Sequence, residues 1–119
     1  MAKVVEAETS HNYNKIIPGA QIKGDIISDG DLRLDGTLIG NLSLKGKLVL
    51  GEGGSILGKV ICKSCDISGN IKGEVKCDEL MTLRSTSVVE AYLLVGRLVI
   101  EIGSTFTGTC KMKKENGEA

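Results

Sequence analysis

The sequence predicts an all-β chain, folded as a single-domain right-handed parallel β-helix of triangular cross-section. Two observations support this: a glycine-centred unit recurs every 15–18 residues, and apolar residues alternate with polar ones on both sides of each glycine. Repeats of this length with strand-like content are typical of solenoids. A turn of that length divides into three short strands, and no segment has the period of a crossover helix. About six turns are expected.

The repeated unit reads apolar, any residue, glycine, any residue, apolar. Five copies fit it, and their centres are Gly24, Gly40, Gly58, Gly73 and Gly108. A sixth, degenerate copy is centred on Glu90 and gives spacings of 16, 18, 15, 17 and 18 residues. Glycine at a repeated position permits a bend or a close backbone approach. An inward carboxylate without a partner is unfavourable, so we expect a bulge or bend that turns Glu90 to solvent.

The expected organisation has three parts. Residues 1–15 are polar and patternless, and residues 113–119 are charged without apolar periodicity, so both are expected to be flexible tails. Residues 16–112 form the β-helix domain. Its turns differ in length, and we expect the glycine-rich stretch at 51–54 to form a loop that accommodates extra residues.

Composition limits the classes of function. Hydrophobic residues make up 41% of the chain and aromatic residues only 3%, which suits a narrow aliphatic interior. Fifteen basic and fifteen acidic residues leave no net charge, which argues against nucleic-acid binding. Neither a signal peptide nor a membrane-spanning run is recognisable, so we expect a cytoplasmic protein whose four cysteines are reduced.

Two short motifs are candidate sites of chemistry. Residues 53–60 fit a phosphate-binding loop except that Val60 replaces the hydroxyl residue and a strand is expected where the motif needs a helix. Cys62 and Cys65 have the spacing of half a zinc site or of a redox pair. However, Cys62 and Cys77 take the same position in consecutive units, and no histidine lies nearby, so packing as small hydrophobes is favoured. No metal, nucleotide or other cofactor is expected.

No catalytic residues are expected either. His11, the only histidine, lies in the predicted tail, so it cannot join an acid-base pair in the body. A solvated outer face explains the scattered carboxylates better than a glycan-cleaving pair does. These carboxylates are Asp25, Asp35, Asp66 and Glu74. We therefore expect a protein that is not an enzyme.

The ends of the predicted rod are the main candidate sites. A β-helix exposes unpaired strand edges and core at its first and last turns, and soluble solenoids normally cap them. No cap is recognisable here, so self-association through the ends is expected. The residues expected at these ends are Ile22 and Ile26 at one and Ile102, Phe106, Cys110 and Met112 at the other. Phe106 is suited to stacking across such a junction, although filling the last core layer also explains it.

A second candidate surface consists of apolar residues at odd offsets from the glycines, which should face outward. A stripe of this kind serves lateral pairing of filaments or contact with a membrane or partner. Its members are Ile27, Ile39, Leu57, Ile61, Val89 and Leu93.

The segment from Ile17 to Ile26, the Leu-Asp-Gly-Thr-Leu-Ile-Gly stretch at 34–40 and the Phe-Thr-Gly at 106–108 resemble the bactofilins over about 90 residues. The resemblance implies a bacterial cytoskeletal protein that polymerises without nucleotide into nonpolar filaments, often at the inner membrane face, with roles in cell shape or polarity. It also implies a position beside peptidoglycan-modifying enzymes and a role for Phe106 in end-to-end contacts. In many relatives a short apolar N-terminal stretch targets the membrane, and only Val4 and Val5 match it here.

Two alternatives remain. A left-handed β-helix acyltransferase would need strict hexapeptide spacing and usually a histidine in the coil, which the irregular turns and the position of His11 oppose. A capped, monomeric β-helix that binds glycans would sediment as a single 12.6 kDa species.

Overall fold

The computed structural model describes residues 4–7, 13–16 and 18–112, and it describes side-chain surroundings for residues 18–112. Within these ranges the regular structure is entirely β, and all strand pairs are parallel. The strands are β1 (Val4–Ala7), β2 (Tyr13–Ile16), β3 (Gln21–Ser28), β4 (Asp31–Leu34), β5 (Thr37–Leu44), β6 (Lys47–Leu50), β7 (Ser55–Cys62), β8 (Ser64–Ile67), β9 (Asn70–Leu83), β10 (Val88–Ile100) and β11 (Thr105–Met112). The predicted parallel β-helix is confirmed.

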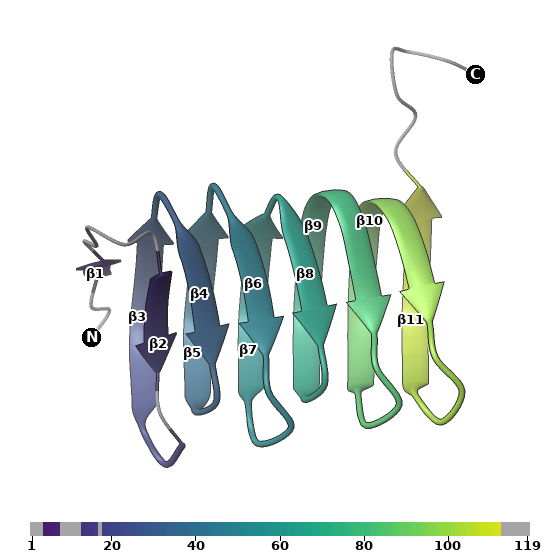
Figure 1. Cartoon of the computed structure of the whole chain (residues 1–119), viewed down its shortest axis with the longest axis horizontal. Coiled ribbons are helices and arrows are strands. Elements are labelled where there is room, and N and C mark those ends of the chain that lie inside the picture. Colours follow the sequence, from purple (N-terminus) through teal and green to yellow (C-terminus); the bar gives the residue numbers. More distant parts are fainter. Residues whose placement is uncertain (1–3, 8–12, 17, 113–119) are drawn as a thin grey trace.

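Each turn of the coil combines a long and a short strand segment. In the first turns these are separate strands, such as β3 and β4, whereas β9 and β10 run through both segments without a break. The long segments pair in the order β3, β5, β7, β9, β10 and β11, so that the turns stack along the long axis (Figure 1). These six strand layers enclose five complete turns, one fewer than the six expected, because β11 begins a turn that the described chain does not finish.

The glycine column lies in the middle of the long segments. Gly24, Gly40, Gly58 and Gly73 are register neighbours in successive turns, and all have φ between +134° and +143°. A Cβ on Gly58 would overlap the carbonyl group of Gly40, and each later glycine meets its predecessor in the same way. These four positions therefore favour glycine for two reasons, since L side chains rarely adopt this φ and a Cβ has little room here.

The alignment of the sixth unit was wrong by one residue. Ala91, and not Glu90, stands between Gly73 and Gly108 in the column, so the spacings of the last two turns are 18 and 17 residues. The sequence permits both alignments, because apolar residues flank both Glu90 and Ala91 at the required offsets. The observed one leaves Glu90 exposed, where its carboxylate pairs with Lys72 Nζ at 3.8 Å. Glu90 is therefore exposed, as expected. The expected bulge is not found at this residue, where β10 stays in register with β9.

The core is a stack of aliphatic layers. Its inward columns repeat from turn to turn, and the short-segment column is Leu34, Leu50, Ile67, Leu83 and Ile100. The first four of these are 0% exposed, whereas Ile100, in the last layer, is 51% exposed. Burial of this aliphatic surface is the main stabilising contribution to the coil.

Bends between strands carry the variation in turn length. The loop at 51–54 takes up extra residues as expected, and Gly51 N–H donates to the Leu34 carbonyl at 2.9 Å, so the loop also bonds to the turn before it. The strand β7 follows this loop directly, which leaves no helix N-terminus for a phosphate. The phosphate-loop pattern is thus a structural bend.

The N-terminal segment differs from its expectation. Within residues 1–15, expected to be a flexible tail, the structure places β1 beside β3 and most of β2 beside β4. A free strand edge can recruit any segment of suitable length, and short polar segments give little sequence signal of this pairing. His11 and residues 113–119 lie outside the described residues.

Candidate assembly surfaces and a cysteine cluster

The C-terminal end of the coil is open in the described part of the chain. The last strand, β11, pairs with β10 along one edge, and its other edge has no strand partner among the described residues. Its inward side chains are only partly covered: Phe106 and Cys110 are half-buried and Met112 is 52% exposed. Beside them, Ile102 is 97% exposed in the bend before β11. This end therefore presents both unpaired backbone groups and apolar core.

The N-terminal end is partly covered. The backbone of β1 pairs with residues 25–28 of β3, and Val5 is the register neighbour of Ile26. Ile26 is only 2% exposed, so the expectation that it lies on an open end is not supported. Ile22 is half-buried and lies outside the part of β3 that pairs with β1. Val4 and Val5 belong to β1, and their proposed membrane contact stays a prediction.

The outward apolar stripe needs two corrections. Val89 and Leu93 are 0% exposed, because the alignment centred on Ala91 turns both into the core. Their neighbours Val88 and Tyr92, each 41% exposed, take the outward positions.

The remaining apolar positions are outward but do not form one continuous stripe. Ile39 and Leu57 are adjacent in one column, which continues as Lys72 and Glu90. Ile27 and Ile61 belong to another column, in which Ser43 separates them. The exposed fractions of Ile27, Leu57 and Ile61 are 49%, 50% and 47%.

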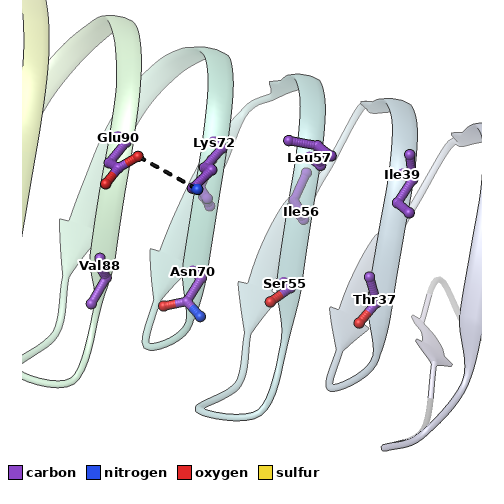
Figure 2. Close-up of a pocket in the computed structure, with 10 residues that line it drawn as sticks. Thr37, Ile39, Ser55, Ile56, Leu57, Asn70, Lys72, Val88 and Glu90 are labelled. Atoms are coloured by element: carbon purple, nitrogen blue, oxygen red, sulfur yellow. Dashed lines mark ion pairs between the residues drawn. The ribbon is translucent and has the colours of Figure 1, made fainter.

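A groove of about 530 Å³ lies on the outer face across β5, β7, β9 and β10. Figure 2 shows that its rim combines Ile39, Leu57 and Val88 with the Lys72–Glu90 ion pair. Its remaining lining residues are Thr37, Ser55, Ile56, Asn70 and Ile71. The groove can accept an apolar side chain from another molecule beside a charged pair.

The scattered carboxylates are engaged by neighbouring side chains. Glu74 lies 3.8 Å from Lys59, and Asp25 accepts a hydrogen bond from the Asn41 side chain at 3.0 Å. Asp35 pairs with Arg33 at 2.8 Å. These contacts link turns or neighbouring residues, as expected for a solvated face rather than for a pair of catalytic acids.

Arg84 connects three successive turns on the short-segment face. Its guanidinium donates to both carboxylate oxygens of Asp66, at 2.9 and 2.6 Å, and to Glu101 at 2.9 Å. The hydrogen bonds from Arg84 to Asp66, together with the positive charge of Arg84, lower the pKa of Asp66. The two-pronged geometry fixes the orientation of the Arg84–Asp66 pair as well as holding its charges together.

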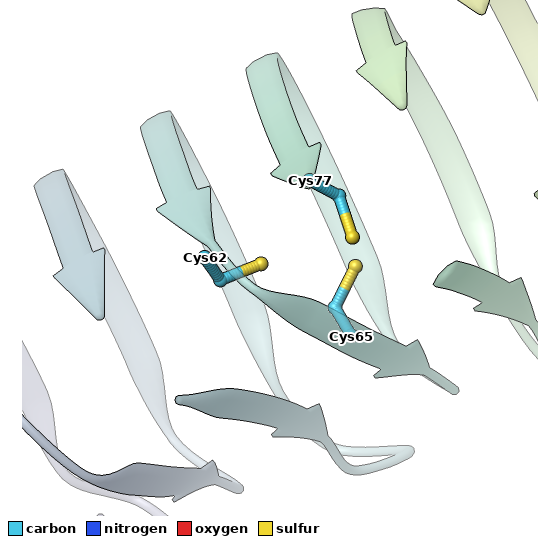
Figure 3. Close-up of side chains that lie close together, drawn as sticks. All are labelled: Cys62, Cys65 and Cys77. Carbon is cyan, nitrogen blue, oxygen red and sulfur yellow. The ribbon is translucent and has the colours of Figure 1, made fainter. Parts of the chain in front are cut away.

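Three cysteines converge at one bend of the coil. Cys62 ends β7, Cys65 lies in β8 and Cys77 lies in β9, and their Sγ atoms all lie within 4.8 Å of one another (Figure 3). All three are buried. The shared column position of Cys62 and Cys77 was recognised from the sequence and is confirmed. The approach of Cys65 was not, because it depends on how sharply the chain turns at Lys63.

The three thiols share hydrogen bonds. Donation from Cys62 and Cys65 lowers the pKa of Cys77 and outweighs the effect of burial. The same contacts with Cys62 and Cys77, together with burial, raise the pKa of Cys65. Hydrogen bonding among the three sulfur atoms thus moves the pKa values of Cys77 and Cys65 in opposite directions.

The described residues thus form a parallel β-solenoid with one open end, a class of structure suited to association through its strand edge and exposed core. A family model described as bactofilin, polymer-forming cytoskeletal, matches residues 14–111. The chain therefore belongs to the bactofilin family, and the resemblance found in its sequence is confirmed.

Two bactofilins of Myxococcus xanthus (strain DK1622) are similar to this chain. It is 28% identical to bactofilin BacO over 108 residues, which cover 90% of this chain and 86% of BacO. It is 26% identical to bactofilin BacP over 114 residues, 94% of this chain and 48% of BacP, so it spans about half of that protein. No solved structure matches the chain. Among the described residues, no helix is long and apolar enough to cross a membrane.

Proposed function

We propose that this chain is a cytoskeletal scaffold that assembles end to end into nonpolar filaments without nucleotide. The observation that carries the proposal is the unfinished last layer of the coil. Val89, Leu93 and Val95 in β10 are 0% exposed because β11 covers them. Their register neighbours in β11 are Phe106, Cys110 and Met112, which have no such cover among the described residues. A second chain laid on β11 would complete the same layer.

Contact between like ends is the simplest form of this junction. Two β11 strands related by a two-fold axis would run antiparallel, and each would supply the same residues to the other. Such a contact closes on itself and forms a dimer, so a filament also needs contact between the N-terminal ends. At that end, the edge of β3 that faces away from β5 has no strand partner at residues 21–24 among the described residues. Ile22 lies in this unpaired stretch. Alternating contacts of this kind would give a nonpolar filament.

The cellular role is proposed from family membership. The family description, polymer-forming cytoskeletal, supports a scaffold for cell shape or polarity in the bacterial cytoplasm. We further propose that the filaments lie at the inner face of the cytoplasmic membrane and position peptidoglycan-modifying enzymes. Val4 and Val5 are the residues proposed for this membrane contact, and they lie in β1, which pairs with β3.

The scaffold role involves no catalysis, cofactor or nucleic acid in this proposal. Its support is the engagement of the surface carboxylates in turn-to-turn contacts and the strand that follows the phosphate-like loop. Exposed apolar surface instead occurs at the open end, along the groove and at Ile27 and Ile61 on the outer face, as expected for a protein whose partner is another copy of itself.

The test is electron microscopy and sedimentation of the purified chain without nucleotide, compared with Phe106→Arg. A charge buried at the junction without a partner should cost several kcal/mol, which corresponds to a rise of at least about 100-fold in the concentration needed for assembly. Thr109→Arg is the matched control, because it adds the same charge to the outer face of the same strand.

Filaments of the unmodified chain and of Thr109→Arg, with loss of filaments in Phe106→Arg, would support the proposal. Filaments that survive in Phe106→Arg would remove Phe106 from the junction. A single 12.6 kDa species for the unmodified chain at all concentrations would contradict assembly and favour a monomeric glycan-binding solenoid. Incorporation of labelled acyl groups would favour an acyltransferase.

A further inference from the structure

Four buried sulfur atoms gather where two columns of the core meet at one bend. One column runs Leu44, Cys62, Cys77 and Val95, and the facing column runs Leu48, Cys65, Met81 and Leu98. In the layers on either side both columns are aliphatic, whereas in the two middle layers all four positions carry sulfur. Cys62, Cys65, Cys77 and Met81 are each at most 3% exposed.

The three thiols have the spacing of a ligand set. Their sulfur atoms lie within 4.8 Å of one another, and they point toward one shared space from three strands (Figure 3). Metal–thiolate bonds of about 2.3 Å in a three-coordinate plane place sulfur atoms about 4.0 Å apart. A contraction of less than about 1 Å would therefore bring all three into bonding distance, which side-chain rotation can supply.

We propose that Cys62, Cys65 and Cys77 bind one Cu(I) ion inside the coil. The donor set decides the ion: among the described residues the group consists of cysteines alone, without a histidine or carboxylate. The register neighbour of Cys65 in the next turn is Met81, which carries a thioether. Soft sulfur ligands select Cu(I), which accepts low coordination numbers. Zn(II) normally requires four tetrahedral ligands of the Cys, His or carboxylate kind, and this site supplies only three.

The surroundings of the three cysteines suit an ion that replaces their thiol protons. Binding releases thiol protons to solvent, because each cysteine binds the ion as a thiolate. A surface cavity of about 250 Å³ is lined in part by Cys65 and Leu80, so it adjoins one of the three cysteines. The bend there is short, since only Lys63 separates β7 from β8, and this shortness brings Cys62 and Cys65 together.

The test is anaerobic titration of the reduced, metal-free chain with Cu(I) against a chromogenic Cu(I) chelator. We expect one tightly bound copper per chain and, by X-ray absorption, only sulfur neighbours at about 2.3 Å. Cys77→Val should weaken binding by at least about 100-fold, because it removes one of three ligands. Valine is chosen because Val95 fills the same column in the next turn. Cys110→Val, which changes the cysteine outside the cluster, should bind copper as the unmodified chain does.

Circular dichroism of Cys77→Val checks that the coil is intact, and the X-ray absorption spectrum of the unmodified chain tests the site without any variant. Binding of less than one copper per chain would overturn the proposal, and so would nitrogen or oxygen neighbours around the copper. An equal loss of copper affinity in Cys77→Val and Cys110→Val would overturn it too. A disulfide among the three cysteines under these conditions, found as a mass loss of two hydrogen atoms, would do so as well. Displacement of the copper by equimolar Zn(II) would overturn the choice of ion.

Discussion

Phe106 lies beside Val89 in the neighbouring turn, yet Val89 is fully buried and Phe106 is only partly covered. The two residues hold the same column position, so the difference comes only from the strand that covers β10 and the lack of one over β11 among the described residues. The boundary of the core thus falls between two chemically similar layers. The expected effects of substitution differ sharply on its two sides.

Ile67→Ala and Ile100→Ala test this boundary with the same substitution in one column. Ile67 is 0% exposed, so its truncation should leave a cavity and lower the free energy of unfolding by about 2–5 kcal/mol. Ile100 is 51% exposed, and its truncation in an isolated chain should cost less than about 1 kcal/mol. Urea unfolding at low protein concentration, followed by circular dichroism, measures both. Equal losses would mean that the coil extends beyond Ile100 in solution.

Gly58→Ala should be strongly destabilising. Its φ is +143°, and an added Cβ would overlap the Gly40 carbonyl group, so both strain and a clash oppose alanine. We expect a loss of at least about 2 kcal/mol in the free energy of unfolding. Gly53→Ala is the control, because its Cβ would meet only the Asp35 carbonyl oxygen at 3.6 Å, an ordinary contact. That variant should stay within about 1 kcal/mol of the unmodified chain. A loss of less than about 1 kcal/mol in Gly58→Ala would show that neighbouring turns can move apart at the glycine column.

Arg84→Met should change the acid sensitivity of the coil. The lowered pKa of Asp66 means that its contribution to stability is present above the ordinary carboxyl pKa and is lost as the pH falls through the lowered value. Removing Arg84 should raise the pKa of Asp66 and flatten this dependence. NMR titration of the Asp66 carboxyl carbon and urea midpoints at neutral and acid pH measure the two effects.

Lys45→Met is the matched control, because its pair with Asp29 is far more exposed, with side chains 81% and 87% accessible. Weak, screened pairs of this kind contribute little. The pKa of Asp66 should be unchanged in this variant. An unchanged pKa in Arg84→Met would instead show that the Arg84–Asp66 hydrogen bonds do not form in solution.

Leu57→Lys and Ile61→Lys test lateral contacts between filaments. Both side chains are about half exposed on the outer face, and lysine there should prevent close apposition of two filaments without touching the end layer. Electron microscopy should show single filaments without bundles. Ser43→Lys, in the same column as Ile61, adds the charge without removing an apolar side chain and should retain more bundling. Unchanged bundling in all three variants would exclude this face from lateral assembly.

The fold could be predicted because the glycine units repeat both a backbone requirement and a burial pattern. Gly24 through Gly73 align without ambiguity, since each has apolar residues at the same even offsets. The last full turn could not be aligned in this way. Val88, Val89, Tyr92 and Leu93 satisfy the pattern in either of two alignments, and only the combined burial of Val89 and Leu93 chooses between them.

The candidate sites were predictable to different degrees. The apolar end at Phe106 follows from the position of the last unit, whereas the coverage of Ile26 by β1 does not, because residues 4–7 carry no repeat signal. Ile39 and Leu57 were expected to face outward and do, but their groove with Val88 and the Lys72–Glu90 pair depends on four turns lying in register.

By itself, the sequence determined that this chain coils, that glycine occupies the centre of most long strand segments and that its interior is aliphatic, because these properties repeat locally along the chain. The tertiary structure alone decided that Ala91, and not Glu90, enters the glycine column. It also decided which end of the coil exposes apolar core and how Cys65 meets Cys62 and Cys77. Those outcomes depend on the length of each bend, and a difference of one residue in a bend exchanges the inner and outer faces of the strand that follows it.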